Sequence, residues 1–368
     1  MIGEALQRAD TRDGIADRAS RQPAPVESPG RRPSMPLPRR LATIAGVAVV
    51  MLLVLEVAVR LIDQRLPEPL LWHSEEAQAK VEQMDALARR GGVDLVFLGT
   101  SIVNAGVEPA VVGEHTGGRV GSYNAGLSSG TPRLMEPWLL DVVGPRLSPD
   151  VVVIGLTSFE VAAVERSPFF DAFAASPAGR QSMRTESRVD RADRWLGERS
   201  ALWANRVALR SPDSVLDAVR GAAPPVSPEV AALQPNGRTS FLQTQQFEDR
   251  VLGVGIDLTD WTIGGDEPAA LRRLVDGVTA SGARAVLVEM PVTDEYIARH
   301  PRGAADYAEF EAFMARFATE AGVDLISDLD TRRDHRWFAD EIHMNNDGAT
   351  AFTAALVDEL RRVGAISA

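Results

Sequence analysis

The sequence of 368 residues contains no cysteine, which excludes disulfide bonds, thiolate metal ligands and a cysteine nucleophile. It leaves the redox compartment open, because an exported protein need not contain disulfides. Lysine is nearly absent too: Lys80 is the only one, and arginine supplies the remaining positive charge. We interpret that scarcity as a coding bias without functional meaning. The histidines and acidic residues lack the spacing of a zinc site, so we expect no metal and no cofactor.

Positive charge is in deficit over the whole chain, since 39 basic residues face 51 acidic ones and the formal net charge is −12. A field of that sign repels nucleic-acid phosphates, so nucleic acid is not expected as a partner. Apolar residues make up 45% and charged residues 24%, a composition typical of globular proteins rather than disordered ones. The length suits two domains, or one α/β domain with insertions.

The charge is unevenly distributed along the sequence. Residues 1–40 contain eight arginines against five acidic residues, a net charge of +3, which leaves −15 for the rest of the chain. Six prolines lie between residues 23 and 38, and no apolar periodicity accompanies them. This composition predicts a disordered, basic N-terminal tail on the cytoplasmic side.

A long apolar run follows the tail, over residues 41–62. A hydrocarbon core of about 30 Å needs roughly 20 helical residues, so the run is long enough to cross a membrane. Glu56 and Arg60 are four residues apart near its distal end, where they can pair on one helical face. Four arginines between residues 31 and 40 predict a cytoplasmic N-terminus and an exported remainder. We therefore expect a single-pass signal anchor in the cell membrane; a cleaved signal peptide and a buried core helix are the alternatives.

Beyond the run, short apolar segments alternate with helical patterns. Residues 63–92 are expected to form a juxtamembrane helix and linker, with Ser74 as the N-cap of a helix over 74–90. Buried strands are predicted at 93–98, 120–123, 151–155, 283–290 and 323–327, and helices at about 107–116, 132–146, 268–281, 303–321 and 346–363. This alternation is typical of a doubly wound, flavodoxin-like α/β domain, a parallel sheet of about five strands flanked by helices, here over residues 93–368.

An insertion interrupts the alternation between the third and fourth strands, at about residues 163–260. It is rich in arginine, aspartate, serine and proline, and its 188–209 segment has the periodicity of an amphipathic helix. A connection of this length is too long for an ordinary loop, so we expect a helical subdomain or a partly ordered lid.

Candidate catalytic residues follow the predicted strands, because ligands of open α/β sheets bind beyond the carboxyl ends of the strands. The first strand ends in Gly99-Thr100-Ser101, and a serine on a tight turn into a helix exposes its hydroxyl. Asp340 lies three residues before His343, ahead of the last helix. That spacing lets the carboxylate accept from Nδ1 of the imidazole while Nε2 faces the serine. Together these residues meet the requirements of an activated nucleophile.

In the order of these motifs the chain resembles the SGNH (GDSL-like) hydrolase family. The resemblance is to its membrane-anchored, cell-envelope branch, which includes D-alanyl-transfer and polysaccharide O-acetylation proteins, and it covers residues 93–363 apart from the insertion. It implies that Ser101 is the nucleophile, His343 the general base and Asp340 the carboxylate that orients the base.

The oxyanion hole is where the chain departs from the family pattern. Gly126, in the motif Asn124-Ala-Gly after the second strand, is implied to be the second N–H donor beside the amide of Ser101. The usual Gly-Asp-Ser is Gly-Thr-Ser here, as in envelope relatives, and the asparagine of the third block is absent. Leu156-Thr157-Ser158 stands in its place, so Ser158 or Asn124 would have to supply that donor. Loss of one donor can lower turnover by about 10²–10³.

The resemblance implies a membrane-tethered, extracytoplasmic serine esterase or O-acyltransferase. Its substrates would be acyl esters, above all acetyl esters, of envelope carbohydrate or lipid, and a membrane acyl-transfer protein is an implied partner. Two alternatives stay open. A non-catalytic envelope-assembly or glycan-binding protein would keep the fold without the chemistry. A phosphate- or nucleotide-binding domain is less favoured, because neither Gly-x-Gly-x-x-Gly nor a P-loop follows the first strand.

Overall fold

The computed structural model describes residues 37–163, 168–224, 226–240, 247, 258–327, 329 and 334–367. Most of the predicted basic tail lies outside the described residues. The chain divides into two compact units, residues 1–55 and 56–368, and each is described by itself.

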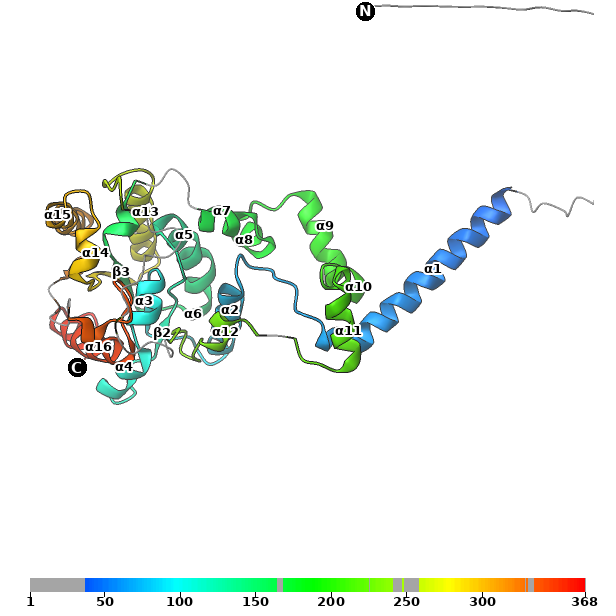
Figure 1. Ribbon diagram of the computed structural model, residues 1–368, viewed down its shortest axis with the longest axis horizontal. Coiled ribbons are helices and arrows are strands. Elements are labelled where there is room, and N and C mark those ends of the chain that lie inside the picture. Colours follow the sequence, from blue (N-terminus) through cyan, green and yellow to red (C-terminus); the bar gives the residue numbers. More distant parts are fainter. Residues whose placement is uncertain are drawn as a thin grey trace, which may run out of the picture. The chain divides into compact units, whose positions relative to one another are not determined.

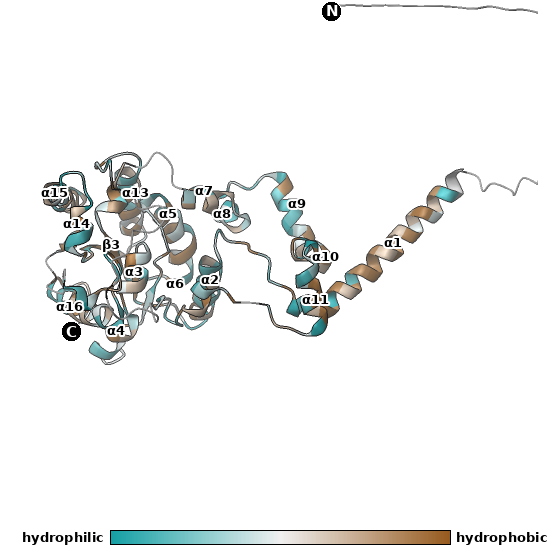
Figure 2. Ribbon diagram, viewed as in Figure 1, coloured by the Kyte–Doolittle hydropathy of each residue, from teal (hydrophilic) through white to brown (hydrophobic). Residues whose placement is uncertain are grey.

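The first helix, α1 (Leu37–Ile62), contains the predicted membrane-spanning run (Figure 1). Figure 2 shows that most of its surface is apolar, and its large side chains between Leu41 and Leu55 are exposed. The stretch Arg40–Arg65 is long and apolar enough to cross a membrane, and only 6% of its most apolar window is buried. A helix of this length and composition fits the predicted membrane anchor and also fits a signal sequence.

The distal end of α1 belongs to the second unit, where it is bound to the insertion. Arg60 donates from Nε to Oε1 of Glu56 at 2.8 Å, which confirms the predicted pair. The same carboxylate also accepts hydrogen bonds from the amides of Ala201 and Leu202, at 2.9 and 3.0 Å. These amides begin α10 (Ala201–Ala204) and have no acceptor within their own helix, so Glu56 caps α10.

The insertion is helical in most of its described residues. The predicted helix over 188–209 is present as three pieces, because Ser200 starts a new helix when its Oγ accepts from the amide of Trp203 at 3.1 Å. The pieces are α9 (Arg188–Gly197), α10 and a 3-10 turn (Ala208–Arg210). The other helices of the insertion are α7 (Pro168–Ala175), α8 (Pro177–Ser182), α11 (Pro212–Arg220) and α12 (Pro228–Ala231).

Five parallel strands form the sheet, in the order β2-β1-β3-β4-β5. They are β1 (Leu95–Leu98), β2 (Ser122–Asn124), β3 (Val151–Leu156), β4 (Arg284–Glu289) and β5 (Asp324–Ile326). Val96 pairs with Tyr123 on one side and with Val152 on the other. The parallel direction and the strand order confirm the predicted doubly wound fold. The order reverses at β1, so the carboxyl ends of β1, β2 and β3 form the crevice in which such folds bind ligands.

Helices cover both faces of the sheet (Figure 1). One group in mutual contact consists of α3 (Ser101–Gly106), α4 (Pro109–His115) and α16 (Asn346–Arg362). Right-handed crossovers place the other helices that connect the strands on the opposite face: α5 (Pro132–Pro137), α6 (Gly144–Leu147), α13 (Glu267–Ala280) and α15 (Ala304–Ala321). The short α14 (Asp294–Ala298) follows β4.

Helix α2 (Glu75–Ala88) precedes the sheet in the sequence and packs into the same core. Its predicted N-cap is confirmed, because Ser74 Oγ accepts from the amide of Ala77 at 3.1 Å. Ala77, Val81 and Met84 are buried against the residues of the sheet and of α6. The helix is therefore a part of the α/β core as well as the connection to α1.

The predicted helix over 132–146 is present, but its middle is not α-helical. The structure has α5 and α6 separated by a wider π-helical turn, Trp138–Val143. Pro137 ends α5, because proline lacks the amide hydrogen and clashes with the carbonyl four residues earlier. A π-turn spreads the chain and accommodates that lost hydrogen bond.

Two glycines let the helix α3 pack directly on the ends of β1 and β3. A Cβ atom at Gly155 would lie 2.4 Å from Val103 Cγ2 and 2.8 Å from Met290 Sδ, and one at Gly99 would lie 2.3 Å from the same methyl group. The side chain of Val103, on α3, thus occupies the space above both glycines. This contact sets how close the first turn of α3 can lie to the sheet.

We expect Gly155→Ala to lower the free energy of unfolding by about 1–3 kcal/mol, because the added methyl overpacks the contact with Val103. The matched control is Gly113→Ala in α4, where a Cβ atom meets nothing within 4 Å. There alanine should stabilise the helix by about 0.5–1 kcal/mol. Denaturant unfolding measures both variants, and equal stabilities would contradict the close packing of α3.

Candidate active site

Ser101 lies at the first position of α3, directly after β1. Thr100 is the N-cap of this helix, and its hydroxyl donates to Oε1 of Glu160 at 2.7 Å. The amide of Ser101 belongs to the first turn, where no carbonyl within the helix can accept it. Ser101 is partly exposed while the other residues of α3 are buried. Its hydroxyl is therefore held on a rigid turn at the carboxyl edge of the sheet.

His343 and Asp340 meet Ser101 from the loop between the 3-10 turn His335–Trp337 and α16. The Nε2 atom of His343 lies 2.9 Å from Ser101 Oγ. Its Nδ1 atom lies 2.9 Å from Oδ2 and 3.0 Å from Oδ1 of Asp340. Oδ1 of Asp340 also accepts from the amides of Ile342 and His343, at 3.0 and 2.8 Å. The three side chains thus form one hydrogen-bonded chain, from carboxylate through imidazole to hydroxyl.

The carboxyl group of Asp340 is held in its ionised form. Burial by itself would raise its pKa, but the hydrogen bond and charge interaction with His343 and the two backbone amides outweigh this and lower the pKa. An ionised carboxylate accepts the Nδ1–H bond and so leaves Nε2 free to accept the proton of Ser101. This is the arrangement of a general base.

Gly126 follows β2 and lies beside α3: a Cβ atom there would be 3.0 Å from the amide nitrogen of Asn104. The amide of Gly126 donates to Oδ1 of Asn124 at 3.1 Å. The side chain of Asn124 is fully buried, and its Nδ2 donates to the carbonyls of Val103 and Val107, both at 2.9 Å. Asn124 is therefore engaged in holding α3 and the Gly126 amide, rather than presented to a substrate.

Ser158, which the sequence offered as the replacement donor, lies in a separate buried cluster. Its Oγ is 2.8 Å from the hydroxyl of Tyr296 and 2.8 Å from Nε2 of His300. Ser158 is completely buried. Next to it, Glu160 accepts from the amide and the hydroxyl of Thr157, both at 2.6 Å. The structure brings Ser101, His343 and Asp340 together and leaves Ser158 engaged elsewhere.

Sequence reasoning missed Arg238, which comes from the insertion and binds both α3 and the start of α16. Its Nε donates to the carbonyl of Ala105 at 2.9 Å, at the end of α3, and its Nη2 donates to Oδ1 of Asn346 at 2.8 Å, at the start of α16. Glu108 pairs with Nη1 at 2.8 Å. The guanidinium thus links the helix that carries Ser101 to the segment that carries His343. No local signal distinguishes it from the many other arginines.

Among the residues that the structure describes, no group of three histidine, aspartate or glutamate side chains is arranged to hold a metal ion.

Comparisons with known proteins place this geometry in context. No family model and no curated protein matches the chain. Solved structures do match it, and esterases and a GDSL-like lipase are among them. The chain is similar to GDSL-like hydrolases.

Three of these structures show the extent of the likeness. A GDSL-like lipase from Bacteroides thetaiotaomicron VPI-5482 has 12% identity and a TM-score of 0.38, with 78% of this chain and 100% of that chain covered. A psychrotrophic esterase, EstA, from Pseudoalteromonas sp. has 12% identity and a TM-score of 0.36, covering 73% and 97%. An aryl esterase from M. smegmatis has 13% identity and a TM-score of 0.37, with 73% of this chain and 99% of that chain covered. At such identities the chemistry rests on the triad itself.

Proposed function

We propose that this protein is a membrane-tethered serine esterase or O-acyltransferase whose catalytic residues are Ser101, His343 and Asp340. One observation carries the proposal: the hydrogen-bonded chain from Asp340 through both ring nitrogens of His343 to Ser101 Oγ. A nucleophile, its base and the group that orients the base are thus in contact and partly exposed, which a purely structural serine does not need.

The reaction runs in two steps. Ser101 Oγ attacks the carbonyl carbon of an ester while its proton passes to Nε2 of His343. The tetrahedral intermediate collapses when His343 returns that proton to the departing alkoxide, which leaves an acyl-Ser101 ester. Water or a sugar hydroxyl then gives up a proton to His343 and attacks the acyl carbon. The bond from that carbon to Ser101 Oγ breaks, His343 returns the proton to Oγ, and the acid or the new ester is released. Hydrolase and transferase differ only in this acceptor.

The developing oxyanion is bound by backbone amides in this scheme. The amide of Ser101 is one donor and the amide of Gly126 is the second. Gly126 N–H has a neutral acceptor at 3.1 Å in Asn124 Oδ1. An oxyanion competes well with it, because a hydrogen bond to a charged acceptor is roughly twice as strong as a neutral one. The side chain of Asn124 thereby keeps the amide oriented until charge develops.

The location of the site supports the choice of substrate class. An apolar helix precedes the domain, and the arginine-rich tail before it favours a cytoplasmic N-terminus. In this topology the triad faces the cell envelope, where acyl esters, especially acetyl esters, of carbohydrate and lipid are the accessible substrates. A membrane acyl-transfer partner fits the transferase form of the reaction.

A membrane-impermeant fluorophosphonate tests activity and topology together. We expect stoichiometric labelling of Ser101 in intact spheroplasts, with the label in the membrane fraction, because an activated serine attacks phosphorus and the adduct mimics the tetrahedral intermediate. Labelling that occurs only after permeabilisation would reverse the topology, and no labelling under either condition would favour a non-catalytic glycan-binding protein.

A further inference from the structure

The only lysine of the chain is completely buried beside the candidate active site. Lys80 lies on α2, and its side chain has no exposed surface. Lysine is rarely buried, because removing an ammonium group from water costs far more than its aliphatic stem gains. Such a group is retained only where hydrogen bonds and a counter-charge compensate for the lost water. The partners of Lys80 therefore indicate what it does.

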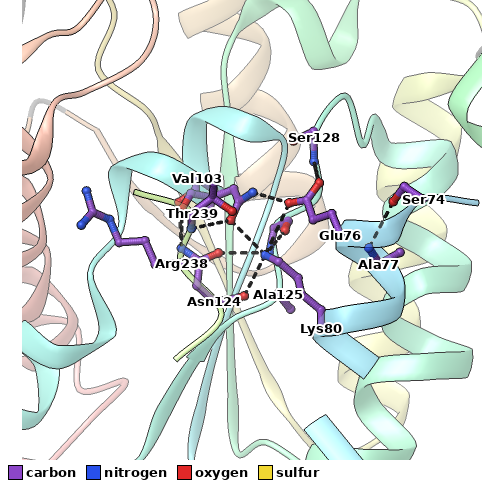
Figure 3. Close-up of polar contacts among 12 residues, drawn as sticks. Ser74, Glu76, Ala77, Lys80, Val103, Asn124, Ala125, Ser128, Arg238 and Thr239 are labelled. Carbon is purple, nitrogen blue, oxygen red and sulfur yellow. Dashed lines mark hydrogen bonds and ion pairs between the residues drawn. The ribbon is translucent and has the colours of Figure 1, made fainter. Parts of the chain in front are cut away.

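The ammonium group of Lys80 binds three oxygens, as Figure 3 shows. Nζ donates to Oδ1 of Asn104 at 2.9 Å and to the carbonyl of Asn124 at 3.2 Å. It also donates to the carbonyl of Gly126. Asn104 is on α3, three residues after Ser101, whereas the two carbonyls are on the segment that carries the Gly126 amide. All three hydrogens of the ammonium group are therefore used between these two elements.

Glu76, one helical turn before Lys80, binds the same two elements with the opposite charge. Its carboxylate accepts from Nδ2 of Asn104 and, at 3.2 Å, from the amide of Ser128. The amide side chain of Asn104 thus lies between the carboxylate and the ammonium, which bind its two ends. Nζ of Lys80 and Oε1 of Glu76 are 3.9 Å apart. This mutual compensation lets both charges remain in a buried place.

We propose that Lys80 is a positioning residue of the oxyanion hole: from α2 it holds the nucleophile helix and the 124–128 segment against each other through Asn104, Asn124 and Gly126. The proposal rests on the proposed function, which places one amide donor on each of these elements. The amide of Ser101 is on α3 and the amide of Gly126 is on the 124–128 segment, so neither element alone fixes the distance between the two donors. The tripod of hydrogen bonds from Nζ fixes this separation.

The charge of Lys80 is sensitive to alkaline pH. Burial lowers its pKa to about 8, although the charge of Glu76 acts in the opposite direction. Besides Glu76, the titratable group in contact with Lys80 is Tyr123, whose hydroxyl donates to the backbone carbonyl of Lys80. Above pH 8 the neutral amine has fewer hydrogens to donate and no charge. Turnover of the wild type should therefore decline on the alkaline side.

Two variants remove the tripod. Lys80→Met keeps the length of the side chain without the charge, and the double variant Glu76→Gln/Lys80→Met leaves no lone buried carboxylate. In both we expect kcat for a small activated acetyl ester to fall about 10²-fold with KM nearly unchanged, because misplaced donors weaken binding of the transition state only. The alkaline decline of the wild type should be absent. The matched control is Met84→Ala on the same helix, which should lower the melting temperature and keep kcat.

Amide hydrogen exchange tests the positioning role independently of activity, because it measures how firmly the segments bound by Lys80 are held. In full-length Lys80→Met and in the double variant, exchange should accelerate in residues 124–128 and in α3, and stay unchanged in α13. Unchanged exchange in these segments, or faster exchange with wild-type kcat, would overturn the role of Lys80. An equal loss of kcat in Met84→Ala would overturn it as well, because the loss would then follow stability alone. Failure of the wild type to react with the fluorophosphonate is a separate result and counts against the proposed function itself.

Discussion

Replacement of Ser101 by alanine should lower kcat/KM for a small acetyl ester by about 10⁴-fold or more, because no other group can form the acyl intermediate. The hydroxyl is partly exposed, so the loss should leave the melting temperature nearly unchanged. Initial rates with p-nitrophenyl acetate and thermal unfolding of the same preparation measure the two effects. An active Ser101→Ala protein would remove the triad from the mechanism.

The chain provides a matched control for this variant, since Ser158 also contacts a histidine. Ser158 Oγ lies 2.8 Å from Nε2 of His300, close to the 2.9 Å between Ser101 and His343. Ser158→Ala should retain most of the activity and lose about 1–3 kcal/mol of stability, because it leaves buried polar partners without a hydrogen bond. The two serines thus separate catalysis from stability. If Ser158→Ala lost more activity than Ser101→Ala, then Ser158 and not Ser101 would be the nucleophile.

The parts of the fold that the sequence predicted are those set by local pattern. The apolar runs that became β1 and β3 and the N-cap Ser74 need no distant partner to be recognised. The order of Ser101, Asp340 and His343 indicated which strand ends would meet, because parallel strands bring their carboxyl ends to one edge. The observed hydrogen bonds join those three residues.

The supporting residues could not be predicted, because their roles depend on contacts between distant segments. Lys80 was interpreted as a compositional accident, and only its burial against Asn104 and Gly126 gives it a meaning. Arg238 reaches α3 and α16 from an insertion whose path no periodicity defines. The presence of a single lysine in an arginine-rich sequence was the one available signal. Composition alone cannot show whether such a residue has a role.

Replacement of Asp340 by asparagine should lower kcat by about 10³–10⁴-fold. The carboxylate accepts from three donors: the ring Nδ1–H of His343 and the amides of Ile342 and His343. Asparagine has one acceptor oxygen, which the two amides will take, so its NH₂ group turns toward Nδ1. Nδ1 must then accept, the ring proton moves to Nε2, and Nε2 can no longer remove the proton of Ser101. Steady-state rates across pH measure the loss.

The pH profile distinguishes this change of tautomer from a loosened loop. The pKa of Asp340 is lowered, so in the wild type the carboxylate stays ionised in mild acid, and its protonation lowers kcat/KM only in stronger acid. In Asp340→Asn no carboxylate titrates at this position, so this fall in stronger acid should be absent. The neighbouring Asp334→Asn is the control: asparagine can cap the 3-10 turn as aspartate does, and neither rate nor profile should change. A loosened loop would lower the rate at every pH by the same factor, whereas a misplaced proton changes the shape of the profile.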